Sequence, residues 1–150
     1  MTNVIDKNEP EISLENLKLM FSRQDGFMAA LGADIIDIGP GTATVRMSVG
    51  KEHLNFNGSC HGGCIFSLAD FAFGVSSNSH GVMAAGIDAH ITYQAAAYAG
   101  EILTAHSREI SRSRKIATYQ IEVESETNGL IASFTGTVYI IGKPHSPKTG

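Results

Sequence analysis

The longest predicted helix lies within residues His53 to Ile87, which read HLNFNGSCHGGCIFSLADFAFGVSSNSHGVMAAGI. The first part of this stretch is rich in Asn, Gly and Ser and predicts an irregular loop. From about Gly62 to Ser79, apolar residues recur every three or four positions, which is typical of a helix. One face carries Ile65, Leu68, Ala69, Ala72 and Val75, and a second carries Gly63, Ser67, Asp70, Gly74 and Ser77. The second face consists of small or polar residues, so another backbone can approach it closely.

The rest of the chain is dominated by predicted strands. Alternation of apolar and polar residues, as in ATYQIEV, is the pattern of a half-buried strand. Gly39–Gly41 and Asn128–Gly129 are turn signals. Two short helices are expected near the start, capped by Ser13 and by Asp25. The expected strands are Asp34–Ile38, Thr42–Val49, Met83–Ala97, Glu101–Ile110, Ile116–Glu124 and Leu130–Ile141. Long antiparallel strands around one apolar helix make an α+β domain.

The length of 150 residues suits one domain. We expect a flexible N-terminus over residues 1–12, a single domain over 13–142 and a flexible tail over 143–150. Charged residues make up only 17% of the chain, against a usual share of about 25%. A chain with so little charge is expected to hide surface by self-association.

Charge, hydropathy and cysteine content exclude several classes of protein. The net charge of −4 argues against a nucleic-acid partner. There is no apolar run of roughly 20 residues and the polar N-terminus resembles no signal peptide, so we expect no membrane association. Two cysteines are too few for a secreted disulfide framework, which indicates a cytoplasmic protein.

Asp70 is the only charged residue between Glu52 and Asp88 when histidine is counted as neutral. Its neighbours in sequence are mostly apolar. Burial of a carboxylate among such residues raises its pKa, which suits a general base or a nucleophile. The alternative is that Asp70 points to solvent or accepts hydrogen bonds from a nearby loop.

The glycine pair Gly62–Gly63 stands at the predicted start of the helix. Open amides at a helix start stabilise negative charge and could form an oxyanion hole for a thioester. Asp70 lies eight residues beyond Gly62, or about 12 Å along a helix. Either the two groups serve different purposes, or a symmetric dimer brings Asp70 of one copy to Gly62 of the other.

These residues resemble a known family. The runs Asn55–Gly63 (NFNGSCHGG), Phe66–Asp70 (FSLAD) and Ala117–Val123 are similar to the phenylacetic-acid-degradation (PaaI-type) thioesterases, and the similarity continues from about Phe27 to Ile141. The resemblance implies a hotdog fold, in which a curved antiparallel sheet wraps a long helix. It also implies dimers, paired again into tetramers, that hydrolyse acyl-CoA without a metal or cofactor. The implied substrates are medium-chain or aromatic, such as phenylacetyl- or hydroxyphenylacetyl-CoA, with coenzyme A as part of the substrate.

The resemblance also implies roles for individual residues. Asp70 activates water or attacks the thioester, and the Gly62 amide binds the oxyanion. Asn55 positions the thioester or the water. His61 holds the loop before the helix and, with Gly63, is expected on the substrate side.

Three cations, Arg112, Arg114 and Lys115, fall where the family meets the phosphates of coenzyme A. The chain departs from relatives at two places. Gln94–Ala95 stands where many carry Arg-Pro, and Gly86–Ile87 stands where some carry a serine that assists the water. The acyl pocket and the way in which water is held are therefore open.

Other interpretations remain at this level. Cys60, His61 and Cys64 are one ligand short of a structural zinc site. A nucleophilic cysteine with His61 is chemically possible but lacks an evident acid to orient the histidine. A hotdog dehydratase would use a histidine with an acid, and His61 is the candidate. A non-catalytic acyl-CoA or acyl-carrier binding module would not need Asp70.

Overall fold

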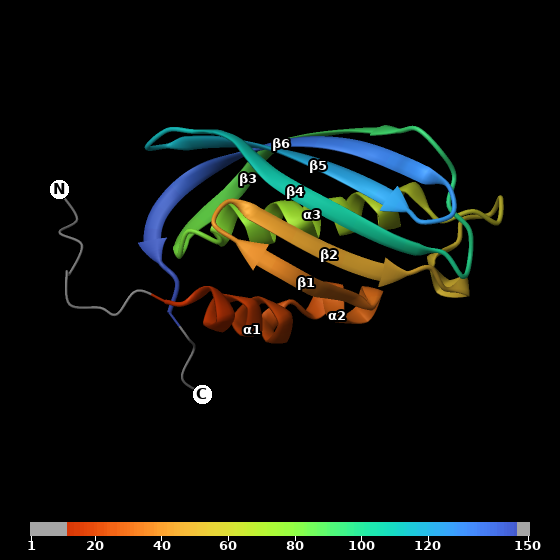
Figure 1. Ribbon diagram of the computed structural model, residues 1–150, viewed down its shortest axis with the longest axis horizontal. Helices are drawn as coiled ribbons and strands as arrows, with labels where there is room; N and C mark the ends of the chain where they lie inside the picture. Colours follow the sequence, from red (N-terminus) through yellow and green to blue (C-terminus); the bar gives the residue numbers. More distant parts are fainter. Residues whose placement is uncertain (1–11, 147–150) are drawn as a thin grey trace.

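The computed structural model describes residues 12–146 (Figure 1). Three helices and one 3-10 turn accompany six strands. The helices are α1 (Leu14–Gln24), α2 (Gly26–Leu31) and α3 (Gly62–Asn78), and the 3-10 turn is Lys51–His53. The strands are β1 (Ala33–Gly39), β2 (Thr42–Ser48), β3 (Val82–Tyr93), β4 (Ile102–Arg112), β5 (Ile116–Ser125) and β6 (Gly129–Pro144). They form one antiparallel sheet in the order β1-β2-β4-β5-β6-β3.

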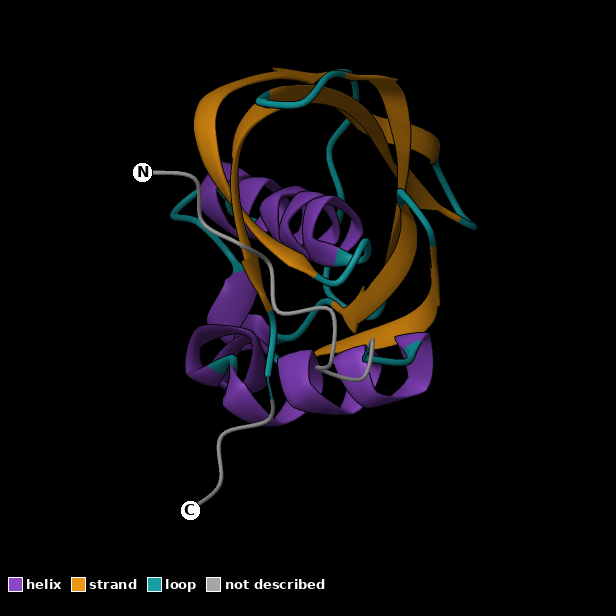
Figure 2. Ribbon diagram, turned by 90° about the vertical axis from the view of Figure 1, so that its left-hand side faces the viewer, coloured by secondary structure: helices purple, strands orange, loops and turns teal. Residues whose placement is uncertain are grey.

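The sheet curves around α3, as Figure 2 shows. Leu68, Ala69 and Ala72 on the helix are fully buried. They meet buried strand residues that include Tyr119, Ile121 and Phe134. The predicted apolar face of the helix and the alternation along β5 are therefore confirmed, because both bury the same core. The architecture is the expected hotdog fold of class α+β.

Close approach of helix and sheet depends on Gly136 of β6. A Cβ at this position would lie 2.7 Å from the ring of Phe73. That ring packs at 5.6 Å from Phe134 and 5.9 Å from Tyr119, measured between ring centroids. Only a residue without a side chain leaves room for Phe73 at this point.

Helices α1 and α2 lie beside β1 at the open side of the sheet (Figure 1). Ser13 Oγ accepts from the Asn16 amide at 3.2 Å, and Asp25 Oδ1 accepts from the Met28 amide at 3.1 Å. Gly32 ends α2 at a φ of 78°. Both predicted caps are confirmed. No helix within residues 12–146 has the length and apolarity needed to cross a bilayer.

Two expected boundaries were wrong. The strand expected over Met83–Ala97 ends at Tyr93, because the amides of Gln94 and Ala95 both turn to one carbonyl, that of Ile131. At the other end, β6 continues to Pro144, which pairs with Val82. Residues 143 and 144 thus belong to the sheet, not to a tail. The expected flexible N-terminus and the end of the tail, residues 1–11 and 147–150, lie outside the described residues.

Candidate active site

Asp70 projects from the exposed side of α3 into a pocket of about 550 Å³. The pocket lies between α3 and the segment formed by α1 and α2. Apolar side chains, including Phe27 and Val75, make up much of its wall, and Asp25 lies at its edge. The carboxylate is therefore accessible to a ligand, and it is surrounded on several sides by protein.

Partial burial, and then the negative charge of Asp25, raise the pKa of Asp70 above its ordinary value. Both effects disfavour the ionised form, so the ionised carboxylate is a stronger base than one in water. Asp25 is held in place because its side chain caps α2. The predicted rise in pKa is confirmed in direction, although Asp70 itself is not buried.

The start of α3 leaves one amide available. His61 caps the helix: its Nδ1 accepts from the Gly63 amide at 2.8 Å. The amides of Cys64 and Ile65 donate to the His61 carbonyl at 2.9 and 3.1 Å. Within residues 12–146, the Gly62 amide has no acceptor. It stands beside a second pocket, of about 360 Å³, which Tyr93 also lines.

Asp70 and Gly62 do not meet within one chain. They line different pockets. Eight residues of helix separate them by about 12 Å. One carbonyl group cannot contact both groups of the same chain. Two alternatives therefore remain: Asp70 and Gly62 serve different purposes, or they belong to one site that is shared between two copies.

The Asn55 side chain forms its hydrogen bonds within its own loop. Its Oδ1 accepts from the amides of Asn57 and Ser59 at 2.9 and 3.2 Å, and its Nδ2 donates to Ser59 Oγ at 3.1 Å. This pattern fixes the turn that leads into α3. Like the His61 ring, the Asn55 side chain shapes the approach to Gly62 and lines neither the Asp70 pocket nor the Gly62 pocket.

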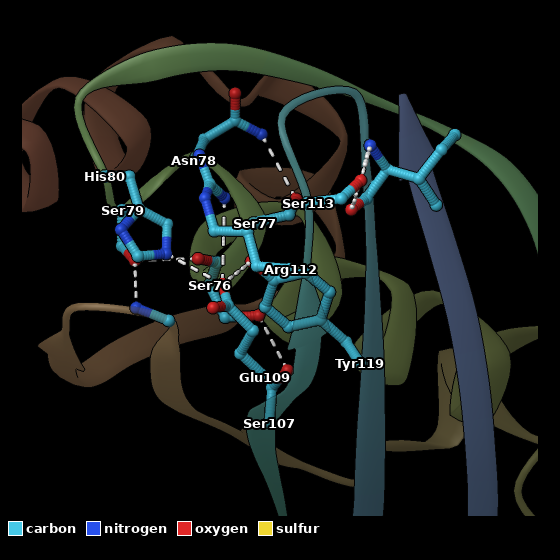
Figure 3. Close-up of polar contacts among 12 residues, drawn as sticks. Ser76, Ser77, Asn78, Ser79, His80, Ser107, Glu109, Arg112, Ser113 and Tyr119 are labelled. Carbon is cyan, nitrogen blue, oxygen red and sulfur yellow. Dashed lines mark hydrogen bonds and ion pairs between the residues drawn. The ribbon is translucent and has the colours of Figure 1, made fainter. Parts of the chain in front are cut away.

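The three cations expected at coenzyme A lie beyond the opposite end of α3 from Gly62. Figure 3 shows Arg112 beside Glu109 and His80. Its Nη1 is 3.7 Å from Glu109 Oε2, which also receives a hydrogen bond from Tyr119 at 2.5 Å and lies 2.7 Å from His80 Nε2. Arg114 is exposed in the β4–β5 turn, and Lys115 Nζ lies 5.4 Å from the ring centroid of Tyr139.

Of the two departures noted in the sequence, Gln94–Ala95 lies at the Gly62 pocket, and Gly86–Ile87 lies on β3 outside both pockets. Gln94 and Ala95 line the Gly62 pocket, and Gln94 Nε2 donates to Ser133 Oγ at 3.1 Å. Gly86 faces Phe73, since a Cβ there would lie 3.0 Å from the ring. Ile87 is 60% exposed on β3. None of these side chains can take part in acid–base chemistry.

Cys60 and Cys64 are buried free thiols, as expected for small side chains that flank the loop. Contact with Cys64, and then burial, raise the pKa of Cys60 far above its usual value, so this thiol is a poor nucleophile. Among residues 12–146, no three His, Cys, Asp or Glu side chains are placed to hold a metal ion.

The sequence model of the thioesterase superfamily matches residues 57–132, which include Gly62 and Asp70. The chain belongs to the thioesterase superfamily. A putative esterase of Archaeoglobus fulgidus is 46% identical to it over 134 residues, which cover 89% of this chain and 87% of that one. The acyl-coenzyme A thioesterase PaaI of Escherichia coli is 36% identical over 85% of this chain and 91% of its own.

Solved structures agree with this assignment. The E. coli PaaI protein, from the phenylacetic acid degradation operon, matches with a TM-score of 0.85 and 33% identity, over 89% of this chain and 96% of its own. A Streptococcus mutans protein bound to acetyl-CoA matches with a TM-score of 0.72 and 27% identity, over 75% and 91%. This thioesterase is a PaaI-type thioester hydrolase of the hotdog fold.

The sequence did not predict that three further residues lie at the thioesterase's pockets. Tyr93 donates from its hydroxyl to the Gly62 carbonyl at 2.9 Å. Asp25 enters the Asp70 pocket, although its pattern indicated only a helix cap. His145 lines that pocket from a segment that was expected to be a flexible tail. No sequence signal relates these positions to α3, because only the folded chain brings them to it.

Proposed function

We propose that this protein hydrolyses aromatic acyl-CoA, of the phenylacetyl or hydroxyphenylacetyl kind, or medium-chain acyl-CoA, to the free acid and coenzyme A. The observation that carries the proposal is the Asp70 carboxylate, whose pKa is raised, in a pocket lined largely by apolar side chains. An apolar pocket fits the acyl group, and a basic carboxylate fits attack on its thioester.

Asp70 acts in one of two ways. As a general base it takes a proton from water while the water oxygen bonds to the thioester carbonyl carbon. As a nucleophile, its own oxygen forms that bond and gives an anhydride, which water then hydrolyses. In both cases the carbon–sulfur bond breaks, and the sulfur leaves with the bonding electron pair as coenzyme A thiolate, which takes up a proton.

The oxyanion that forms during this step needs a donor, and the Gly62 amide is the proposed one. Because about 12 Å of helix separates it from Asp70, the donor comes from a second copy of the chain. Strand β3 favours such a dimer. It is an edge strand that pairs with β6 alone among the described strands, and it exposes Met83 and Ile87. We infer a homodimer with two shared sites, paired again into a tetramer.

The remaining roles follow from position. Asn55, with His61 and Gly63, shapes the loop on which the Gly62 amide depends, next to the thioester. Arg112, Arg114 and Lys115 supply positive charge for the phosphates of coenzyme A. Since they lie at the far end of α3 from Gly62, they serve a site on a neighbouring copy. The free thiols fit a cytoplasmic protein.

The test is release of free thiol from a panel of acyl-CoAs by the wild type and Asp70→Asn. We expect turnover of aromatic or medium-chain substrates, with a loss of roughly 10²-fold or more in the variant, the scale of a lost acid–base group. Near-native turnover by a folded Asp70→Asn protein removes Asp70 from the mechanism. If the wild type cleaves no acyl-CoA, the dehydratase and binding-module hypotheses replace the thioesterase proposal.

Gly62→Pro tests the oxyanion donor, because proline has no backbone N–H and so removes the proposed hydrogen bond to the oxyanion. Proline suits the first position of a helix, and the extended ψ of 133° at His61 suits a residue before proline. The new Cβ would lie 3.3 Å from the ring of Tyr93, so this exposed side chain, whose hydroxyl donates to the Gly62 carbonyl, must shift by a few tenths of an ångström. We expect a cost of about 3 kcal/mol in transition-state stabilisation. An active, folded variant would discredit this role.

A further inference from the structure

The Asp70 pocket has a definite length along α3. Asp70, Gly74 and Asn78 follow one another at intervals of four residues and all line the pocket. They therefore lie on one face of the helix, about 6 Å apart per step and about 12 Å from first to last. Gly74 stands midway, and a Cβ added there would meet nothing within 4 Å. The middle of the pocket is therefore open beside the helix.

Phe21 and His145 line the pocket at its Asn78 end. The two rings meet edge to face, with centroids 5.5 Å apart and planes at 80°. His145 Nε2 lies 2.8 Å from Asn78 Oδ1, and the His145 amide donates to the Gly81 carbonyl at 2.8 Å. Asn78 is itself fixed to Ala84, whose amide donates to the same Oδ1 at 2.9 Å. Hydrogen bonds thus hold His145 against the end of α3, and Phe21 packs edge to face on its ring.

His145 presents an uncharged ring to the pocket. Partial burial lowers its pKa below the usual value of 6.5, so the ring is neutral at neutral pH. With Phe21 it makes an uncharged aromatic end wall, while the polar atoms of Asn78 are taken up by neighbours on α3 and β3 and by His145. A wall of this kind stops an alkyl or aromatic tail and offers no partner for a charged one.

We propose that Phe21 and His145 are the end stop of the acyl pocket, and that their distance from Asp70 sets the longest acyl chain that this protein accepts. The inference rests on the proposed function, since it takes the thioester to lie at Asp70. With carbon–carbon bonds of about 1.5 Å, an extended chain advances roughly 1.3 Å per carbon. A thioester carbonyl near Asp70 then leaves room for roughly eight carbons before the aromatic pair.

The test uses saturated acyl-CoAs from butyryl to palmitoyl with three proteins: the wild type, His145→Ala and Gly74→Leu. For the wild type, kcat/KM should rise by up to roughly fourfold per added methylene, the value of burying one, and stop rising near eight carbons. His145→Ala removes half of the end wall and should extend the rise by at least two carbons. Gly74→Leu fills the middle and should lower octanoyl-CoA turnover tenfold or more, with butyryl-CoA within twofold of the wild type.

His106→Ala is the matched control, because it removes an exposed histidine on β4 that lies outside this pocket; its chain-length profile should equal that of the wild type. The same series is also titrated by calorimetry into Asp70→Asn, alone and combined with each pocket substitution. These titrations measure acyl binding without turnover. A wild type that cleaves no acyl-CoA defeats the proposed function alone. An equal dependence of Kd and of kcat/KM on chain length in all variants overturns the end stop.

Discussion

At the scale of single residues, the site depends on a carboxylate whose ordinary pKa is shifted by its surroundings. Asp70 owes the rise in its pKa first to partial burial and then to Asp25. The effect of the Asp25 charge can be tested separately. Asp25 acts on Asp70 through its charge, whereas it caps α2 through a side-chain oxygen. Asparagine caps a helix about as well as aspartate does. The charge can therefore be removed while the cap is retained.

Asp25→Asn should move the acid limb of kcat/KM to lower pH. The proposed reaction needs ionised Asp70, so activity should fall as pH drops through the pKa of that group. Removing a neighbouring negative charge lowers this pKa, and the fall then begins at lower pH. The measurement is a pH–rate profile on one acyl-CoA, with Asp37→Asn, an exposed aspartate on β1, as control. A limb that stays in place, or moves to higher pH, contradicts the role given to Asp25.

At the scale of elements, two glycines should respond to the same substitution with opposite signs. Gly74 lies inside α3 with open space beside it, and Gly136 of β6 lies against Phe73. Gly74→Ala should raise the free energy of unfolding by about 0.5–1 kcal/mol, the difference in helix propensity. Gly136→Ala should lower it by about 1–3 kcal/mol through overpacking. Chemical denaturation checks both. Equal signs for the two variants would contradict the packing of α3 against β6.

The polar cluster at the end of α3 links stability to pH. Partial burial opposes ionisation of Glu109, but hydrogen bonds from Tyr119 and His80 and the charge of Arg112 hold its pKa below the usual 4.5. A carboxylate whose pKa is lower in the folded protein than in the unfolded chain stabilises the fold at pH values above its unfolded pKa. This contribution is lost as the pH falls through the folded pKa. Glu109→Gln should therefore cost about 1–3 kcal/mol near pH 7, and the cost should shrink below about pH 4.5. Denaturation at pH 7 and pH 4 checks this, and an equal cost at both would refute it.

The elements were largely predictable because each has a local cause. The apolar stripe of α3, the alternation along β5, and the Ser13 and Asp25 caps all act within a few residues. Of the site, Asp70 stood out because it is a lone charge in an apolar stretch. The effect of Asp25 on the pKa of Asp70 and the position of His145 in the same pocket could not be predicted. Asp25 and His145 lie 45 and 75 positions away from Asp70 in the sequence. The end of β3 at Tyr93 depends on Ile131, which is equally remote.

At the scale of the whole molecule, the proposed site requires more than one chain. The Asp70 pocket and the Gly62 pocket are separate in a single copy. Within residues 12–146, β3 pairs with a strand on one side only, so a second copy can continue the sheet on its other side about a two-fold axis. The charge content of 17% fits a chain that covers part of its surface in this way.

Sedimentation should show a dimer or larger assembly of the 15.9 kDa chain. Ile87→Lys places a charge on the exposed edge of β3 and should weaken that assembly, since lysine on an edge opposes strand pairing. Turnover should fall with the fraction of dimer, because each proposed site needs two chains. An Ile87→Lys protein that is monomeric and fully active would exclude the shared site.

The most direct test of the shared site is complementation between two inactive variants, Asp70→Asn and Gly62→Pro, coexpressed with different tags and purified through both. In a mixed dimer with shared sites, one site carries both substitutions and the other carries none. A shared site should give about half of wild-type turnover per mixed dimer, whereas each variant alone should be nearly inactive. A mixed dimer as inactive as its parents would show that Asp70 and Gly62 act within one chain, or not together at all.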